Sequence, residues 1–233
     1  MMATKHNDGL TLVEMLVVLG IIVVLATIGI RITMRMDTQA KENALRETFA
    51  LLSSALEQFH DYGYTYAPTS VYANTGFDFP PDCDGFLVVH LQETLKATLG
   101  ADSIQITNHV KSVDEEYVEY SGCEVLYFFL SRVPPVAEVL KGLNAALVTN
   151  QNGGGRPVEI SINGGPLESL PRVIDPWGTT LRYDYYEVRQ ATGAPTSTPP
   201  APIPATRRNF PVLTSAGPDR RFGTADDIDS RGR

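Results

Sequence analysis

The chain has 233 residues, of which 43% are hydrophobic and 20% are charged. This composition predicts a folded protein and excludes a disordered one. The formal net charge of −8 and the pI of about 5.0 argue against a protein that binds nucleic acid through a basic face. With 4 His, 2 Cys and no Cys-x-x-Cys or His-Glu-x-x-His pattern, a His/Cys zinc site is not expected.

The most hydrophobic segment lies near the N-terminus. Residues 10–30 read LTLVEMLVVLGIIVVLATIGI and contain one charged residue, Glu14. As an α-helix this segment would measure about 32 Å, enough to cross the hydrocarbon core of a membrane. Three interpretations compete: a cleaved signal peptide, a permanent anchor, or an anchor that also assembles with other copies. Ordinary signal cleavage would fall after Ala26 and leave Thr27 first.

Glu14 bears on this choice because a carboxylate inside a membrane segment costs roughly 2.5–3.5 kcal/mol and calls for a partner. Cleavage between Gly9 and Leu10 would create an amino group one helical turn away from Glu14. The amine and the carboxylate could then pair, within one chain or between neighbours. The alternative is a Glu that reaches the membrane surface and has no further role.

The helical pattern continues beyond the apolar segment. Hydrophobic residues recur at steps of three and four, which predicts one stripe on a helix. No Pro occurs between Leu10 and Ala67, and Gly63 is a stop signal. We therefore predict one helix over 10–62, whose second half packs against the chain's own globular part. The stripe consists of Leu45, Phe49, Leu52, Leu56 and Phe59.

The middle of the chain, 63–170, is predicted to be a variable insertion rich in helices. Hydrophobic spacing indicates two of the helices, and a Ser-x-x-Glu capping box indicates the start of another. Asn-Gly-Gly sequences predict turns. The predicted helices are 86–99, the segment that begins with Ser121-Gly-Cys-Glu124, and 135–148, and the predicted turns are 152–155 and 163–166.

Cys83 and Cys123 also lie in this middle part. Outside the cytoplasm, oxidising conditions would allow a disulfide between them, and two buried thiols are the alternative. His60, His90 and His109 show no spacing typical of metal ligands. We expect these three His residues to face solvent or to pack in the interior.

The C-terminal part, 171–233, is predicted to form an antiparallel β-sheet. Alternating residues predict strands over 181–188 and 210–214. Between them, 192–205 reads TGAPTSTPPAPIPA, and its Pro residues cannot pair in a sheet, so an exposed loop is expected. The sequence Asp175-Pro-Trp-Gly178 predicts a turn with the only Trp packed beneath it.

An acidic segment follows the last predicted strand. Its four Asp residues are Asp219, Asp226, Asp227 and Asp229. Calcium takes six to eight hard oxygen ligands, including backbone carbonyls, which a loop of this kind can provide. The spacing is not that of an EF-hand. A solvated acidic loop is the alternative.

Gly9, the apolar helix and a Glu five residues after Gly9 together resemble the leader of type IV pilin-like proteins. In that family a peptidase cleaves after the Gly, the new amine is methylated, and the retained helices pack in the core of a filament. The resemblance implies that 1–9 is the leader and that Gly9 and Leu10 flank the cut. It also implies that Glu14 is the assembly carboxylate. The implied fold is α+β: a transmembrane helix over 10–30, its amphipathic continuation over 31–62, and a small head that ends in an antiparallel sheet.

The head resembles the major pseudopilins of type II secretion systems. The similar segments are 61–70 at the end of the helix, Asp175-Pro-Trp-Gly178, and the Ser-x-Gly-x-Asp sequence at 215–219 followed by Asp227-Ile228. In those relatives the last segment binds calcium in a structural role. The resemblance implies Asp219 and Asp227 as ligands, with Asp226, Asp229 and the Ala216 carbonyl as additional candidates.

The resemblance implies a non-enzymatic subunit anchored in the inner membrane by a single span, with its head in the periplasm. Its partners would be further copies in a filament, minor pseudopilins, an inner-membrane assembly platform and a prepilin peptidase, with no nucleic acid. The filament would be a periplasmic pseudopilus that helps to move folded proteins across the outer membrane. The alternatives are a type IV pilus subunit for adhesion, motility or DNA uptake, and a membrane-tethered enzyme or binding protein. The sequence contains no familiar hydrolase, zinc-protease or nucleotide-binding motif.

Overall fold

The computed structural model describes residues 12–70, 79–83, 88–109, 121–185 and 210–232. The chain divides into two units, Met1–Asn43 and a compact unit, Ala44–Arg233, which we call the head. Helix α1 (Leu12–Tyr62) contributes to both units. Three further helices and eight short strands are described in the head.

Helix α1 confirms the long helix predicted from the sequence. It ends where Gly63 adopts a positive φ of 63° and donates its N–H to the His60 carbonyl at 3.1 Å, a geometry that glycine adopts without strain. Among the described residues no helix combines the length and hydropathy of a membrane span. The span proposed for 10–30 therefore stays a prediction.

The head is built around the second half of α1. The predicted stripe is buried: Leu45, Leu56 and Phe59 have 0% exposure, and all three belong to one hydrophobic core with residues of α3 and of the C-terminal strands. Burial of each such side chain stabilises the fold by about 1.5–3 kcal/mol. The interpretation of the stripe as core packing is confirmed.

The other helices only partly follow the prediction. Helix α2 (Val88–Leu99) and helix α3 (Ser121–Arg132) confirm two of the predicted helices. The third helix was predicted over 135–148, and this prediction is wrong for the second half of the range. Helix α4 (Pro134–Leu140) is followed by a turn at Gly142 and by the 3₁₀ helix η1 (Ala145–Leu147). The Asn144 side chain accepts a bond from the N–H of Ala146 at 3.0 Å, which starts this new element.

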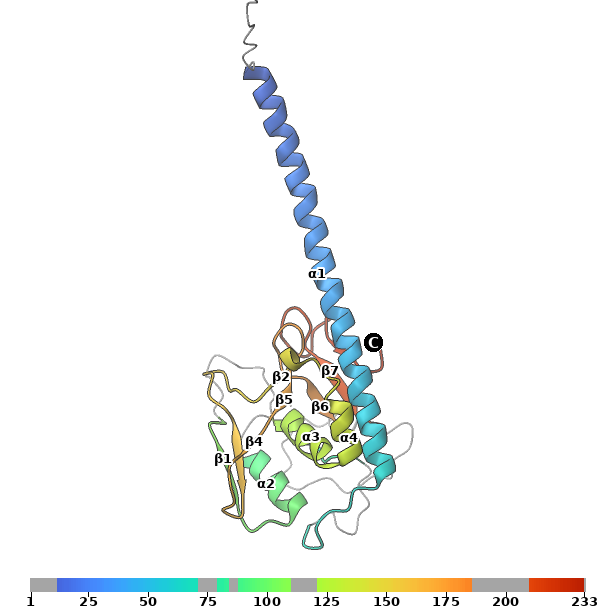
Figure 1. Cartoon of the computed structure of the whole chain (residues 1–233), viewed down its shortest axis with the longest axis vertical. Helices are drawn as coiled ribbons and strands as arrows, with labels where there is room; N and C mark the ends of the chain where they lie inside the picture. The colour runs from blue at the N-terminus through green and yellow to red at the C-terminus, as the bar shows by residue number, and fades with distance from the viewer. Residues whose placement is uncertain (1–11, 71–78, 84–87, 110–120, 186–209, 233) are drawn as a thin grey trace, which may run out of the picture. The chain divides into compact units, whose positions relative to one another are not determined.

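The middle of the chain also contains strands that the sequence analysis missed. Strands β1, β3 and β4 form one antiparallel sheet in the order β1-β3-β4, and β2 pairs with β5. Helix α2 contacts β1 and α3 (Figure 1). The bounds are β1 (Ile104–Thr107), β2 (Val148–Thr149), β3 (Glu159–Ile162), β4 (Glu168–Ser169) and β5 (Arg172–Val173). Turns lie at the predicted 152–155 and 163–166.

The C-terminal sheet has the order β6-β7-β8 and is antiparallel throughout. Tyr183 of β6 pairs with Leu213 of β7, and both side chains are buried in the core. The strands are β6 (Arg182–Asp184), β7 (Val212–Ser215) and β8 (Ile228–Asp229), of which β8 was not predicted. The Pro-rich segment 192–205 lies outside the described residues. The predicted α+β fold, with an N-terminal helix and a C-terminal antiparallel sheet, is confirmed.

Candidate functional site

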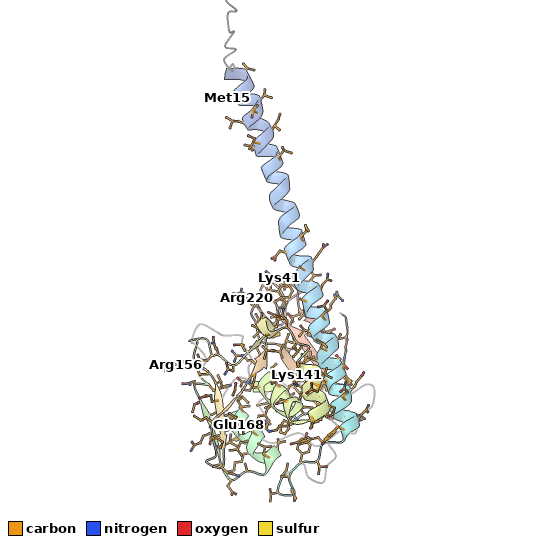
Figure 2. The ribbon with its side chains drawn as sticks, in the orientation of Figure 1. Met15, Lys41, Lys141, Arg156, Glu168 and Arg220 are labelled. Carbon is orange, nitrogen blue, oxygen red and sulfur yellow. The ribbon has the colours of Figure 1, made fainter. Side chains whose placement is uncertain are left out.

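The first half of α1 exposes its hydrophobic side chains. Their exposed fractions range from 48% at Val18 to 68% at Val13, and Figure 2 shows Met15 projecting away from the helix. Because the exposed residues include consecutive positions, they surround the helix. The exposed set is Val13, Met15, Leu16, Val17, Val18, Leu19, Ile21, Ile22, Val23 and Leu25. An exposed hydrophobic surface of this extent requires cover from lipid or from other protein.

The residues predicted for processing and assembly lie at the start of this helix. Gly9 and Leu10 fall outside the described residues, and the backbone of Glu14 is part of the first turn of α1. A carboxylate in a first turn interacts favourably with the helix dipole even without a further partner. The proposed pairing of Glu14 with the amine of Leu10 therefore stays a prediction.

The acidic segment is the loop 216–227 between β7 and β8. We call it the acidic loop. Asp226 accepts hydrogen bonds from the Thr224 hydroxyl at 2.6 Å and from the Asp219 N–H at 3.0 Å. These bonds, with the Thr224 hydroxyl first, lower the pKa of Asp226 from its ordinary value. Asp227 accepts a bond from the Gly223 N–H at 2.7 Å. The carboxylates thus close the loop by binding its own backbone.

The predicted calcium ligands all lie in this loop or in the strand that follows it. Among the described residues no group of three or more acidic, His or Cys side chains is arranged to hold a metal ion. Asp219 and Asp229 each accept a backbone N–H, from Arg221 at 2.8 Å and from Arg231 at 2.9 Å. One carboxylate oxygen, Oδ1 of Asp227, is buried and has no hydrogen-bond partner within the described part of the chain. Carboxylate oxygens are suitable ligands for a hard cation. A buried oxygen normally has a partner, and a cation would provide one for this oxygen.

The predicted turn at Asp175-Pro-Trp-Gly178 is confirmed and lies close to the acidic loop. The Gly178 N–H donates to the Asp175 carbonyl at 2.9 Å, and Trp177 packs half-buried against the core. The Asp175 carboxylate accepts the Ser215 hydroxyl at 2.7 Å. Burial raises the pKa of Asp175, although its hydrogen bonds with Ser215 and with the turn oppose that shift.

A buried ionic cluster in the head was missed from the sequence. His109 Nε2 lies 2.8 Å from one oxygen of Glu124, and Nη1 of Arg172 lies 3.6 Å from the other. The guanidinium also donates to the Thr180 hydroxyl and to the Gln151 carbonyl. The side chains of His109, Glu124 and Arg172 are all buried, so loss of one partner would leave an uncompensated buried group.

This cluster corrects the predicted capping box. Glu124 bonds to His109 instead of to the backbone at Ser121, and the Ser121 hydroxyl finds no hydrogen-bond partner among the residues that the structure describes. Helix α3 forms nonetheless because its apolar face is buried in the core. The partners of Glu124 are far away in the sequence, so local spacing gave no signal of the cluster.

Cys83 and Cys123 are both buried thiols, and no disulfide links them. The predicted disulfide is therefore not formed in this structure, which has the alternative arrangement. The Cys123 sulfur accepts a hydrogen bond from the Val173 N–H at 3.3 Å. Burial raises the pKa of Cys123 to about 12, so its reactive thiolate is not populated at neutral pH.

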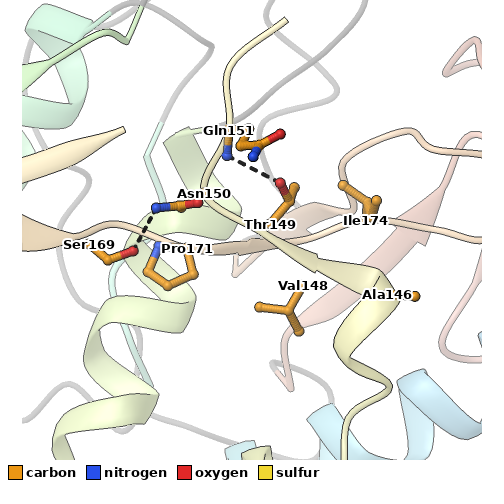
Figure 3. A pocket seen from close by; sticks show the side chains of 8 residues that line it. All are labelled: Ala146, Val148, Thr149, Asn150, Gln151, Ser169, Pro171 and Ile174. Atoms are coloured by element: carbon orange, nitrogen blue, oxygen red, sulfur yellow. Dashed lines mark hydrogen bonds between the residues drawn. The ribbon is translucent and has the colours of Figure 1, made fainter. Parts of the chain in front are cut away.

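An open hollow of about 470 Å³ lies beside β2 and β5 (Figure 3). None of the residues that line it is charged, and Asn150 uses its amide to bind the Ser169 hydroxyl at 2.9 Å. The lining therefore contains no His, carboxylate or Lys side chain of the kind that usually acts as a general acid or base. The hollow does not indicate a catalytic site.

Comparison with known proteins addresses the N-terminal segment alone. Residues 4–30 match the family model of the prokaryotic N-terminal methylation motif. No curated protein and no solved structure matches the chain. The motif includes Gly9, Leu10 and Glu14 and implies processing by a prepilin peptidase and pilus-type assembly. It supports a type IV pilin-like protein: a membrane-anchored, filament-forming structural subunit rather than an enzyme.

Proposed function

We propose that this chain is a structural subunit of a periplasmic pseudopilus in a type II secretion system, where it helps to move folded proteins across the outer membrane. The observation that carries the proposal is the run of exposed hydrophobic side chains on α1, from Val13 to Leu25, which lies within the methylation motif. The turn at 175–178 and the acidic loop, both similar to segments of major pseudopilins, favour a pseudopilus over a type IV pilus.

Hydrophobicity alone does not specify assembly at this helix. Lipid chains are as apolar as Leu and Val, so helices in a membrane gain little by exchanging lipid for one another. A polar group within the apolar segment has more to gain, because it lacks a partner in lipid. We therefore assign register to Glu14, which would pair with the methylated amine at Leu10 of a neighbouring copy.

The test of this assignment is filament assembly by Glu14→Ala in the native host. We expect the variant to insert in the membrane normally and to form at least about tenfold fewer filaments, the loss that 1.4 kcal/mol represents. Glu47→Ala is the matched control, because Glu47 is an exposed carboxylate on the same helix. Normal assembly by Glu14→Ala would contradict the pairing.

Deletion of the gene in the host distinguishes the pseudopilus from the pilus. Loss of secretion of folded proteins, with surface filaments and motility intact, is the expected result. Loss of adhesion, motility or DNA uptake with normal secretion would establish the alternative, a type IV pilus subunit.

For the acidic loop, we propose that it binds calcium in a structural role. The ligands would be Asp219 and Asp227, joined by Asp226, Asp229 and the Ala216 carbonyl. The supporting observation is the buried Oδ1 of Asp227, to which no described residue donates a hydrogen bond. Calcium would supply positive charge among the carboxylates of the loop and would take no part in catalysis.

Thermal unfolding of the full chain in detergent tests the calcium site. Calcium at 100 times its dissociation constant would add about 2.7 kcal/mol of stability, so we expect a higher Tm at millimolar calcium that a chelator reverses. Asp227→Asn should abolish the shift, whereas Glu168→Gln, a change at an exposed salt bridge with Arg132, should retain it. No shift in the unmodified protein would remove the assignment.

A further inference from the structure

The Asp175 carboxylate is nearly inaccessible, with 1% of the residue exposed, and its two oxygens bind different parts of the chain. Oδ1 accepts the backbone N–H groups of Trp177 at 3.0 Å and Thr179 at 2.8 Å, both in its own turn. Oδ2 accepts the hydroxyl of Ser215, a residue 40 positions further along the chain. One buried carboxylate thus joins the turn at 175–178 to the end of β7.

Ser215 is the last residue of β7 and has 0% exposure. Its oxygen also accepts the backbone N–H of Gly217 at 3.1 Å. A hydroxyl has one proton to donate and two lone pairs to accept with. Because Asp175 takes the proton, a lone pair stays available to Gly217, and the two hydrogen bonds reinforce each other. The carboxylate therefore fixes the orientation of the hydroxyl that holds the first turn of the acidic loop.

Gly217 in turn meets the far end of the acidic loop. Its φ is +65°, and a Cβ at this position would overlap the carbonyl oxygen of Asp226. The side chain of Asp226 accepts the N–H of Asp219 at 3.0 Å. The position of Gly217 consequently determines how closely the two ends of the loop approach, and with them the spacing of its carboxylates.

We propose that Asp175 is a positioning residue for the acidic loop, acting through the Ser215 hydroxyl on Gly217. The turn at 175–178 and the loop at 216–227 then behave as one unit. This role does not depend on calcium or on filament assembly, because every contact in the relay is made within the head. A competing account is that Asp175 stabilises only its own turn.

Amide hydrogen exchange of the full chain in detergent, with a chelator present, separates these accounts. Ser215→Ala removes the relay and leaves in place the two backbone hydrogen bonds that Asp175 Oδ1 accepts within the turn. Loss of a hydrogen bond worth about 0.5–1.5 kcal/mol should speed exchange at the loop amides of Gly217, Asp219 and Gly223 by about two- to tenfold. The amides of Trp177 and Thr179 should keep their protection. Unchanged loop amides would overturn the proposal.

The matched control is Ser161→Ala. Ser161 is also a buried Ser in a strand, and its hydroxyl donates to the Gly165 carbonyl at 2.7 Å. This variant removes a comparable hydrogen bond from the hairpin of β3 and β4, so the acidic loop should exchange as in the unmodified protein. If Ser161→Ala accelerates the loop as much as Ser215→Ala does, the effect is general destabilisation and the proposal fails.

The variant Asp175→Asn tests the carboxylate itself. Its amide oxygen can still accept the two N–H groups of the turn, but its NH₂ faces the Ser215 hydroxyl as a donor. We expect faster exchange in the loop and little change in the turn. In the double variant with Ser215→Ala, Asp175→Asn should add nothing further in the loop, because both act through one hydroxyl. Additive acceleration, or acceleration in the turn alone, would refute the relay.

Discussion

Both halves of α1 contain large hydrophobic residues, but these residues differ in how far they are exposed. Leu19 in the first half is 61% exposed, whereas Leu52 in the second half is 1% exposed. In the second half the apolar residues form a stripe, and the head supplies the other side of the contact. In the first half the described hydrophobic side chains include consecutive positions and are exposed. The two halves therefore differ in burial: the stripe of the second half is packed in the head, and the hydrophobic side chains of the first half are exposed.

The largest expected effect comes from removing a side chain on the covered half. Phe59→Ala should lower the free energy of unfolding of the head by about 3–5 kcal/mol, because it empties a fully buried site. Leu19→Ala should change this value by less than about 0.5 kcal/mol. Denaturant unfolding, followed by the fluorescence of Trp177, measures both. Equal losses would contradict the division of α1 into two kinds of surface.

Glycine substitutions sharpen the same comparison. Gly217→Ala should cost at least about 2 kcal/mol of head stability, because it combines positive φ with overlap of the Asp226 carbonyl. Gly20 lies in the exposed half of α1 with nothing within 4 Å of an added Cβ. Gly20→Ala should therefore leave the head unaffected and favour the helix by about 1 kcal/mol. Denaturation and circular dichroism report the two effects, and a loss of helix in Gly20→Ala would be the contrary result.

The smallest effect concerns pH. Burial raises the pKa of Asp175 above its ordinary value of 3.8, so the folded head holds this proton at pH values where the unfolded chain has released it. The contribution of Asp175 to stability is therefore full below that ordinary value and declines as pH rises through the raised pKa. Asp175→Asn should lose this dependence. Its stability relative to the unmodified protein should rise with pH above 4 in denaturant titrations, and a constant difference would be inconsistent with the raised pKa.

Much of the helical architecture could be predicted because its signals are local. The absence of Pro up to Ala67, the stop at Gly63 and the stripe from Leu45 to Phe59 each depend on neighbouring residues. The strands β1 to β5 were not predicted. They are two to four residues long, and so short a segment shows little alternation of hydrophobic and polar residues. The helix predicted through Val148 ended early because Gly142 and Asn144 favour turns, a local preference that the hydrophobic spacing concealed.

The candidate sites could also be predicted only where their signals are local in the sequence. The leader and Glu14 could be singled out because their spacing is fixed within a few residues, and the family match covers that segment. Asp175 could be placed in a turn, but its bond to Ser215 joins residues 40 positions apart. The pairing of Glu124 with His109 and Arg172 likewise depends on tertiary packing, and the local Ser-x-x-Glu pattern pointed to a different role. Contacts between buried polar groups that are far apart in the sequence could be identified only from the structure.

Mass spectrometry of the mature N-terminus, on protein purified from the native host, shows whether the exposed helix is processed for assembly. We expect a chain that begins at Leu10, carries a methyl group on its amine and lacks residues 1–9. A chain that begins at Thr27, or one that retains Met1, would contradict the assembly role of the exposed helix and favour a secreted or merely tethered protein.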